Sequence, residues 1–406
     1  MVDPALQAQV DAQLMEQGAY TALELLFNAG RLSYSDYESW RRGEFELLDS
    51  VLMGDPDKIR RQLEAGAAHA RTIGLVEQAQ EFLAWQVGSA GPPRKLRISA
   101  DAVLDRLIAA RFAPAPDLPQ MDLFFDNPIV AVTNGIVRAL AARNAEEAQR
   151  LLDRLYAQAP NHADLVGLDR LVAALGHLHL SIGDTQRELD FLLEVTPTAK
   201  RLLGAQARDL LAPLWRQLAS ALHGTAFRDD QPWLHPSFAL SEAQDWPAVS
   251  ECVLQESEWW RHEALCVRLA HSCFYQQRRS DGLKAWCQLC WRAPQRAAQL
   301  LEDRQLDRQL DRQLAGLWQQ FSDCDVDGSV PSAAEFPAWL LLHEPGLSQQ
   351  LAEDLPPGNT PGEQHYRCVH QWIQARRGRR QQEELALRRE LHASQPMLFE
   401  KLKSTV

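Results

Sequence analysis

The stretch that decides the fold is residues 128–160, PIVAVTNGIVRALAARNAEEAQRLLDRLYAQAP. Apolar side chains recur at helical spacing on both sides of Arg143 and Asn144, which predicts helices over residues 129–142 and 145–158 with a tight turn between them. Pro160 ends the second helix because proline has no N–H and its ring collides with the preceding turn. The stretch therefore predicts a helical hairpin.

Small and large residues alternate in this hairpin in a way that recurs later in the chain. Ala148 stands twelve residues before Pro160, with Leu152 and Leu155 between them. Equivalent offsets before Pro294 and Pro197 hold Leu269, Ala270, Gly282, Trp286 and Leu289, and a poorer set of Ala173, Thr185, Leu189 and Leu192. Small residues let two helices approach, large ones fill the groove, and proline stops the second helix. The pattern resembles the tetratricopeptide repeat and implies an all-α fold in which helical hairpins stack as an irregular solenoid.

The composition is that of a globular protein larger than one core. The chain has 406 residues, 46% hydrophobic and 24% charged, with a net charge of −12 and a pI near 5.5. A single core stops growing below this length, so several modules are expected. An acidic surface repels phosphate, so direct nucleic-acid binding is not expected.

Targeting signals are not predicted. The start MVDPALQAQVDAQLMEQ has neither a basic end nor an apolar core, and no apolar run is long enough for a membrane span. The seven cysteines are odd in number, and five fall between Cys252 and Cys290, which favours a reducing cytoplasm over a disulfide framework.

Linkers rich in proline and glycine divide the chain into five expected parts. These are an N-terminal helical module (1–90), a linker with a short helix (91–127), the helical repeats (128–300), a helical extension (301–355) and a C-terminal helical pair (356–406). Arg31, Arg41 and Arg42 lie beside a helix–turn–helix pattern in the first part. An ordinary helical hairpin is the preferred interpretation over a DNA-reading one.

The linker holds the sequence QMDLF at residues 120–124, followed by Phe125. This motif resembles the pentapeptide with which many bacterial proteins dock on the replicative DNA sliding clamp, with Met121 where leucine is most frequent. The resemblance implies that Gln120 bonds at a pocket rim, while Met121, Leu123 and Phe124 fill an apolar groove beside Asp122. The alternative is that Phe124 and Phe125 anchor the first repeat helix in the core. A weaker copy, QPMLF, occupies residues 395–399.

Three other clusters contain residue types that bind metal ions or anions. Cys287-x-x-Cys290 with Cys266, Cys273 and His262 has residue types that bind zinc, but packing as small hydrophobic residues is the preferred interpretation. Asp323, Asp325, Asp327 and Gly328 copy half of a calcium loop, yet Ala334 stands where its bidentate glutamate belongs, and Ser332 with Glu335 predicts a capping box. Residues 376–380 hold the arginine patch, a candidate site for an anion or an acidic partner, composed of Arg376, Arg377, Arg379 and Arg380.

No catalytic signature or cofactor motif occurs in the sequence. The expectation is a cytoplasmic, non-enzymatic adaptor or scaffold that binds protein partners. The candidate partner is the DNA sliding clamp, which would make the protein a replication or repair accessory factor. The alternative is a metal-dependent or nucleic-acid-acting protein that uses the Cys/His cluster or the arginine patch.

Overall fold

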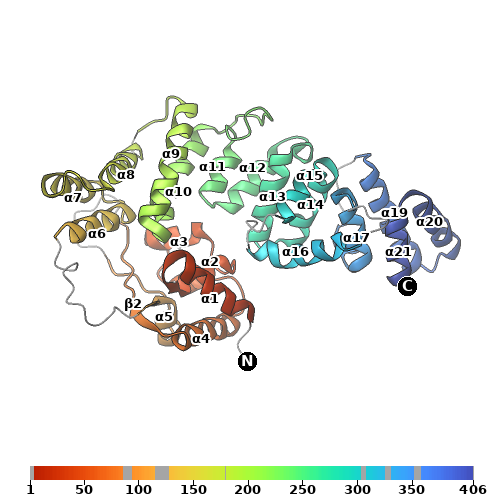
Figure 1. Cartoon of the computed structure of the whole chain (residues 1–406), viewed down its shortest axis with the longest axis horizontal. Helices are drawn as coiled ribbons and strands as arrows, with labels where there is room; N and C mark the ends of the chain where they lie inside the picture. The colour runs from red at the N-terminus through yellow and green to blue at the C-terminus, as the bar shows by residue number, and fades with distance from the viewer. Residues whose placement is uncertain are drawn as a thin grey trace. The chain divides into compact units, whose positions relative to one another are not determined.

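Helices dominate the computed structural model, which describes residues 4–85, 94–114, 128–178, 180–302, 308–324, 331–351 and 358–405. The helix content is 71%, in 21 α-helices within those ranges (Figure 1). The chain divides into two compact units. Unit 1 comprises Met1–Thr225 and Trp233–Asp245, and unit 2 comprises Ala226–Pro232 and Trp246–Val406. No helix in the described ranges is long and apolar enough to cross a membrane.

The N-terminal part of unit 1 is a set of capped helices around a small sheet. Ser33, Asp55 and Asp101 accept backbone N–H groups at three helix starts and so satisfy donors that have no partner within the helix. The helices are α1 (Pro4–Gln17), α2 (Ala22–Asn28), α3 (Tyr34–Arg41), α4 (Pro56–Thr72) and α5 (Ala102–Ala109).

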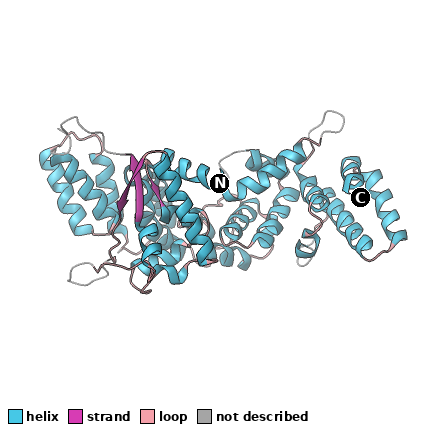
Figure 2. Ribbon diagram, turned by 90° about the horizontal axis from the view of Figure 1, so that it is seen from below, coloured by secondary structure: helices cyan, strands magenta, loops and turns pink. Residues whose placement is uncertain are grey.

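Three short strands form an antiparallel sheet in the order β1–β3–β2 (Figure 2). They are β1 (Tyr20–Thr21), β2 (Leu75–Ala79) and β3 (Ala110–Pro114). Phe112 in β3 is fully buried and pairs with Tyr20 across the ladder. The sheet is not predicted from the sequence, because β1 has only two residues and β3 follows α5 with no turn residue between them.

The rest of unit 1 consists of successive helices that pack on their neighbours in the chain. They are α6 (Pro128–Ala141), α7 (Ala145–Gln158), α8 (Leu165–His177), α9 (Thr185–Leu203), α10 (Ala207–Ala221) and α11 (Pro236–Glu242). The predicted hairpin of residues 129–158 is present as α6 and α7. Ala148, Leu152 and Leu155 are fully buried, as their spacing predicts.

The expectation that Pro197 ends its helix is wrong. Pro197 lies inside α9, which continues to Leu203. A proline within a helix leaves carbonyl groups of the preceding turn without their usual donor. The Thr196 hydroxyl, one residue earlier, donates to the Leu192 carbonyl at 2.7 Å and supplies a side-chain bond in this turn. Pro213 lies inside α10 in the same way.

Unit 2 is also built from helices that pack on their neighbours. The helices are α12 (Trp246–Gln255), α13 (Glu263–Tyr275), α14 (Arg279–Arg292), α15 (Pro294–Glu302), α16 (Arg308–Ser322), α17 (Phe336–His343), α18 (Leu347–Leu351), α19 (Pro361–Arg377), α20 (Gln381–Ser394) and α21 (Pro396–Thr405). The sequence predicts Gly282, Trp286 and Leu289 as packing positions, and all three are buried in α14, which packs on α13.

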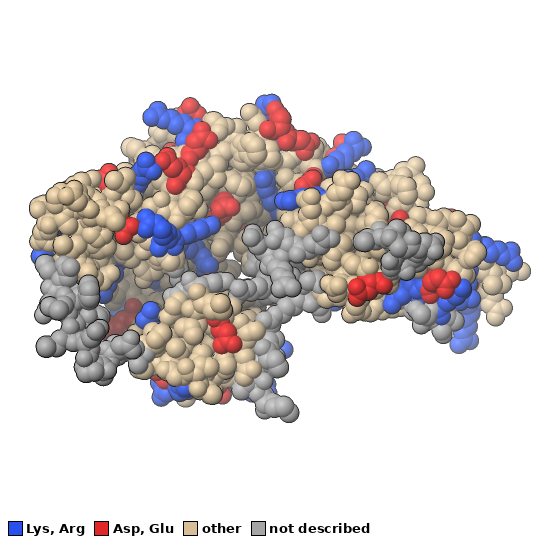
Figure 3. All heavy atoms as spheres, viewed as in Figure 1, with Lys and Arg blue, Asp and Glu red and all other residues tan. Residues whose placement is uncertain are grey.

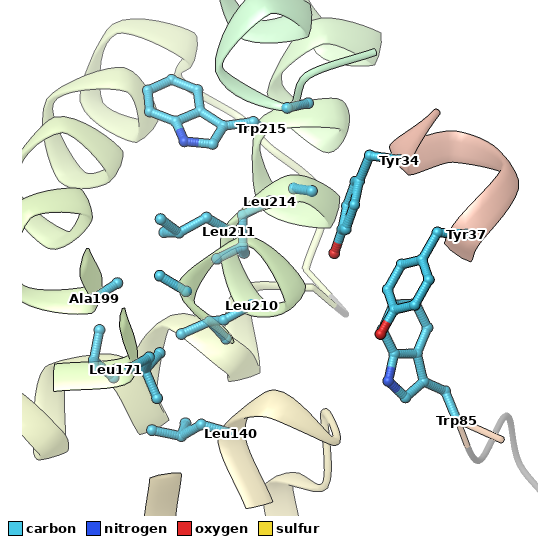
Figure 4. Packing of buried hydrophobic residues seen from close by; sticks show 14 of the residues in the cluster. Tyr34, Tyr37, Trp85, Leu140, Leu171, Ala199, Leu210, Leu211, Leu214 and Trp215 are labelled. Carbon is cyan, nitrogen blue, oxygen red and sulfur yellow. The ribbon is translucent and has the colours of Figure 1, made fainter. Parts of the chain in front are cut away.

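Aromatic side chains of α3 join the N-terminal part of unit 1 to its later helices. Figure 4 shows Tyr34 and Tyr37 from α3, with Trp85, facing α10, whose Leu210 and Leu214 point into the core. These side chains all belong to one continuous buried cluster. The N-terminal helices and the helices that follow residue 128 therefore share one core.

Charged side chains of both signs lie beside one another on the face shown in Figure 3. Most of the ion pairs among the described residues join partly exposed groups, such as Arg150 with Glu147. Pairs of that kind contribute little to stability because water and salt screen them. The acidic net charge is thus spread over mixed surfaces on this face.

One ion pair network in unit 1 is different because its carboxylate is buried. The Glu38 side chain is 1% exposed and contacts two guanidinium groups. Arg143 Nη2 lies 2.7 Å from Glu38 Oε1, and Arg216 Nη1 pairs with Glu38 Oε2. Arg216 also donates to Asp245 at 3.2 Å. A buried carboxylate is tolerated only when such partners compensate for its lost hydration.

Replacing Glu38 by glutamine should destabilise the protein strongly. The substitution keeps the shape of the side chain but leaves Arg143 and Arg216 facing a neutral group, at an expected cost of about 3 kcal/mol. The measurement is urea-induced unfolding. Glu44→Gln is the matched control, because Glu44 pairs with Arg42 on the surface, and it should leave the unfolding curve near that of wild type. Equal curves for Glu38→Gln and wild type would contradict the structural role of Glu38.

Candidate functional site

Three aromatic rings from α2 and α3 line a cavity in unit 1 whose walls carry both apolar and charged side chains. Tyr34 and Tyr37 lie one helical turn apart, so both point to the same side of α3. Phe27 from α2 lies 5.9 Å from Tyr34 and 5.4 Å from Tyr37, measured between ring centroids. The rings support one another at distances typical of favourable aromatic pairs.

The Arg41 guanidinium lies beside these aromatic rings and makes three contacts that position it. Its Nη1 donates to the Tyr37 hydroxyl, and its Nε donates to the Leu83 carbonyl at 3.1 Å. Its guanidinium carbon lies 4.8 Å from the Trp85 ring centroid. Cation–π contact and two hydrogen bonds fix the orientation of the guanidinium plane.

Trp85 is covered from a second side by Arg143, whose guanidinium carbon lies 3.9 Å from the ring centroid. Arg143 comes from the turn between α6 and α7 and has a left-handed backbone, with φ of 55°. Its Nε donates to the Asp209 carbonyl at 2.7 Å. The hairpin turn of α6 and α7 is thereby attached to both Trp85 and α10.

Arg208 and Asp209, at the start of α10, form another wall of the cavity. The Arg208 guanidinium lies 4.9 Å from the Phe27 centroid and 5.2 Å from that of Tyr34. The Tyr34 hydroxyl donates to Asp209 Oδ1 at 2.6 Å. Two adjacent residues of α10 thus bind the same aromatic group through different chemistry.

Burial raises the pKa of the Asp209 carboxyl, and this effect exceeds the opposing one of the Tyr34 hydrogen bond and the nearby guanidiniums. Burial likewise raises the pKa values of Tyr34 and Tyr37, with a further contribution from the Asp209 charge. Both phenols therefore stay protonated at physiological pH and act as hydrogen-bond donors.

The cavity that these groups line is open to solvent and has a volume of about 400 Å³. Its lining includes the guanidinium-bearing side chains of Arg41, Arg138 and Arg208 and the apolar side chains of Leu23, Phe27, Ala141 and Ala142. Guanidinium groups are always charged and only donate hydrogen bonds. The arrangement is suited to holding an anionic group beside an apolar surface.

The predicted clamp-binding motif, Gln120, Met121, Asp122, Leu123 and Phe124, lies outside the described residues, so its exposure is not tested. It falls in the chain between β3 and α6. Its weaker copy at residues 395–399 is part of the C-terminal helices, and Met397 and Leu398 are buried there. Those two side chains belong to the core rather than to a docking peptide.

The cysteine cluster is packed in the helices of unit 2. Cys266, Cys273, Cys287 and Cys290 are buried, and within the described residues there is no group of three or more side chains placed to hold a metal ion. Burial raises the pKa of Cys266 and of Cys287 to about 12, which keeps the thiols protonated. His262 pairs instead with Asp229, at 3.0 Å.

The calcium-like segment is described only in part, since Asp325, Asp327 and Gly328 lie outside the described residues. Asp323 is a turn residue directly after the end of α16. Ser332 does cap the following helical turn, accepting the Ala334 N–H. Glu335 does not complete a capping box, because its buried carboxylate accepts from His365 Nδ1 at 2.9 Å.

The arginine patch is exposed but engaged locally. Arg376 lies over the Trp372 ring, Arg377 donates to the Pro345 carbonyl at 2.9 Å, and Arg380 pairs with Glu383 at 2.8 Å. Arg379 has the left-handed backbone of the turn between α19 and α20. These local contacts favour the interpretation of the patch as a solvent-exposed helix surface over its interpretation as a site for an anion or an acidic partner.

The arginines of the helix–turn–helix interpretation also have partners within unit 1. Arg31 donates to the Met53 carbonyl, and Arg42 pairs with Glu44. Arg41 belongs to the cavity described above, and the sequence analysis did not single it out for that role. The spacing of Tyr34, Tyr37 and Trp40 signals an aromatic helix face. Its partners on α10 are about 170 residues away, beyond the reach of local patterns.

The buried Asp209 should make stability depend on pH in a specific direction. A carboxyl group whose pKa is raised by folding favours the folded state below its ordinary pKa of 3.8, and that contribution is lost as pH rises through the folded-state pKa. Asp209→Asn keeps an acceptor for Tyr34 and cannot ionise. The variant should therefore gain stability relative to wild type as the pH rises from acid to neutral.

The measurement is urea unfolding of wild type and Asp209→Asn across that pH range. A stability difference that is constant with pH, or that grows as the pH falls, would show that the Asp209 carboxyl does not have a raised pKa in the folded protein.

Comparisons with protein families, with curated proteins and with solved structures give no match.

Proposed function

We propose that the protein is a non-catalytic adaptor that binds other proteins through helical hairpins of the tetratricopeptide-like kind. The observation that supports this proposal most is a hairpin geometry that recurs in both units. α7, α14 and α20 each contain fourteen residues, and in each case a single residue separates the end of the helix from a proline: Pro160, Pro294 and Pro396.

The turns that enter these three helices are built alike. Arg143, Gln277 and Arg379 have φ values of 55°, 60° and 54°, each one residue before the N-cap. Each of these residues donates its N–H to the carbonyl three residues back, and the next residue donates to the carbonyl five residues before it. This is the hydrogen-bond pattern of a helix end closed by a left-handed residue.

The exits are alike too. Ala159, Ala293 and Gln395 have similar non-helical backbones, with φ of −146°, −135° and −147° and ψ of 70°, 64° and 86°. Proline excludes the helical conformation from the residue before it, which accounts for the common end point. The third hairpin, α19 with α20, is a copy that sequence patterns did not reveal, because Glu384 and Arg388 stand where Ala148 and Leu152 stand in α7.

Helices of two hairpins approach each other closely at glycine residues, which supports the resemblance to the tetratricopeptide repeat in how the helices pack. A Cβ atom at Gly282 in α14 would lie 2.9 Å from the Phe274 ring, and one at Gly135 in α6 would lie 2.9 Å from Leu151. Helices that approach this closely form rigid pairs, and stacked pairs present surfaces that bind peptides and partner domains in repeat proteins. The step from hairpins to partner binding is an analogy at the level of fold.

The partner we propose is the bacterial DNA sliding clamp, docked through residues 120–124. Two or three apolar side chains in a preformed groove give micromolar affinity without a large interface. In this proposal Leu123 and Phe124 are the side chains that enter the groove of the clamp. The helices that precede and follow the motif in the chain provide surfaces for a further protein. The protein would then act as an accessory factor in replication or repair.

The proposal predicts that purified full-length protein binds a bacterial sliding clamp with micromolar affinity, measured by surface plasmon resonance. The double variant Leu123→Ala/Phe124→Ala should lose this binding while its circular dichroism spectrum and melting temperature stay unchanged. Leu385→Ala, at an exposed leucine in α20, is the control and should bind like wild type.

Failure of the wild-type protein to bind would remove the clamp from the proposal. Unfolding of the double variant would show that Leu123 and Phe124 are core residues, and the clamp would again be withdrawn as a partner.

A further inference from the structure

Three arginines line the cavity of unit 1, and two of them have no acidic partner in the part of the chain that the structure describes. Arg41 and Arg138 form no ion pair there. Arg143 and Arg216, close by, share the buried Glu38 carboxylate. The described residues thus include arginines that stabilise the fold through Glu38 and separate ones, Arg41 and Arg138, that face the cavity and form no ion pair with them.

Arg41 is oriented but not saturated. A guanidinium has five N–H donors. Two of them are used, by the Tyr37 hydroxyl and the Leu83 carbonyl, which leaves three for a ligand. Because the Trp85 ring also fixes the guanidinium plane, little side-chain entropy remains to be lost on binding. Such a guanidinium group is preorganised for a planar, bidentate contact with an anion.

Three carboxylates also line the cavity, and each of them has a partner other than Arg41 and Arg138. Glu24 contacts only Arg208, at the long distance of 3.4 Å. Glu81 is exposed and pairs with Lys95 at 2.6 Å. Asp209 is buried and accepts the Tyr34 hydroxyl. Among the described residues, none of these three carboxylates forms an ion pair with Arg41 or Arg138.

We propose that this cavity binds a small organic anion, a carboxylate or phosphate attached to an apolar body. Arg41 and Arg138 contact the anionic group, and the apolar body lies against Leu23, Phe27 and Ala142. The volume of about 400 Å³ falls within the range of small-ligand pockets. The binding is independent of the proposed docking on the sliding clamp, which uses other residues.

The test is isothermal titration of the full-length protein with benzoate and with phenyl phosphate, using benzamide as a neutral compound of the same shape. Saturable binding of either anion with a Kd below about 5 mM, and none of benzamide, is the expected result. Benzoate alone would identify a carboxylate ligand and phenyl phosphate alone a phosphate ligand. Absence of saturable binding of both anions by about 5 mM, or equal binding of benzamide, overturns the proposal.

Variants assign the binding to the cavity. Arg41→Gln and Arg138→Gln should each weaken it by about tenfold or more, because each removes charge-assisted hydrogen bonds. Arg42→Gln is the matched control, since Arg42 is the neighbour of Arg41 and pairs with Glu44 outside the cavity. Arg138 is exposed, so Arg138→Gln decides the matter if Arg41→Gln fails to fold. Equal losses in Arg42→Gln and Arg138→Gln would place the anion elsewhere and overturn the proposal.

Discussion

Unit 1 depends on the buried carboxylate of Glu38. At 1% exposure this group has lost its water, and it is tolerated because Arg143 and Arg216 replace the lost hydration. The two arginines come from different places, the turn between α6 and α7 and the middle of α10. A single side chain of α3 thereby joins the N-terminal helices to two later elements, and Arg216 extends the connection to Asp245.

The cavity is a consequence of this joining. α3 supplies Tyr34, Tyr37 and Arg41, whereas α10 supplies Arg208 and Asp209. Neither element encloses a ligand site by itself. The groups that hold the elements together, such as Tyr34 with Asp209, also orient the guanidiniums that face the space between them. The arginines near α3 thus have two roles. Arg143 and Arg216 pair with the Glu38 carboxylate and stabilise the fold, whereas Arg41 and Arg138 line the cavity and form no ion pair with the described residues.

Local patterns predicted much of the helical architecture. Ala148, Leu152 and Leu155 were expected in the core of one hairpin and Gly282, Trp286 and Leu289 in another, and all six are buried. Patterns failed at a proline inside a helix and at the small sheet. Pro197 is accommodated within α9, and β3 becomes a strand because β1 and β2 pair with it. The candidate site could not be predicted, since two residues that line it, Tyr34 and Asp209, are 175 residues apart and their contact follows only from the complete fold.

Hydrogen–deuterium exchange of wild type and the Glu38→Gln variant tests this account most directly. If Glu38 joins α3 to α10, the amides of both helices should exchange faster in the variant by a similar factor, because the two open together. The amides of α13 in unit 2 should be unchanged and serve as the internal reference. Faster exchange confined to α3, or equal exchange of variant and wild type throughout, would contradict the claim that this buried carboxylate holds the two helices together.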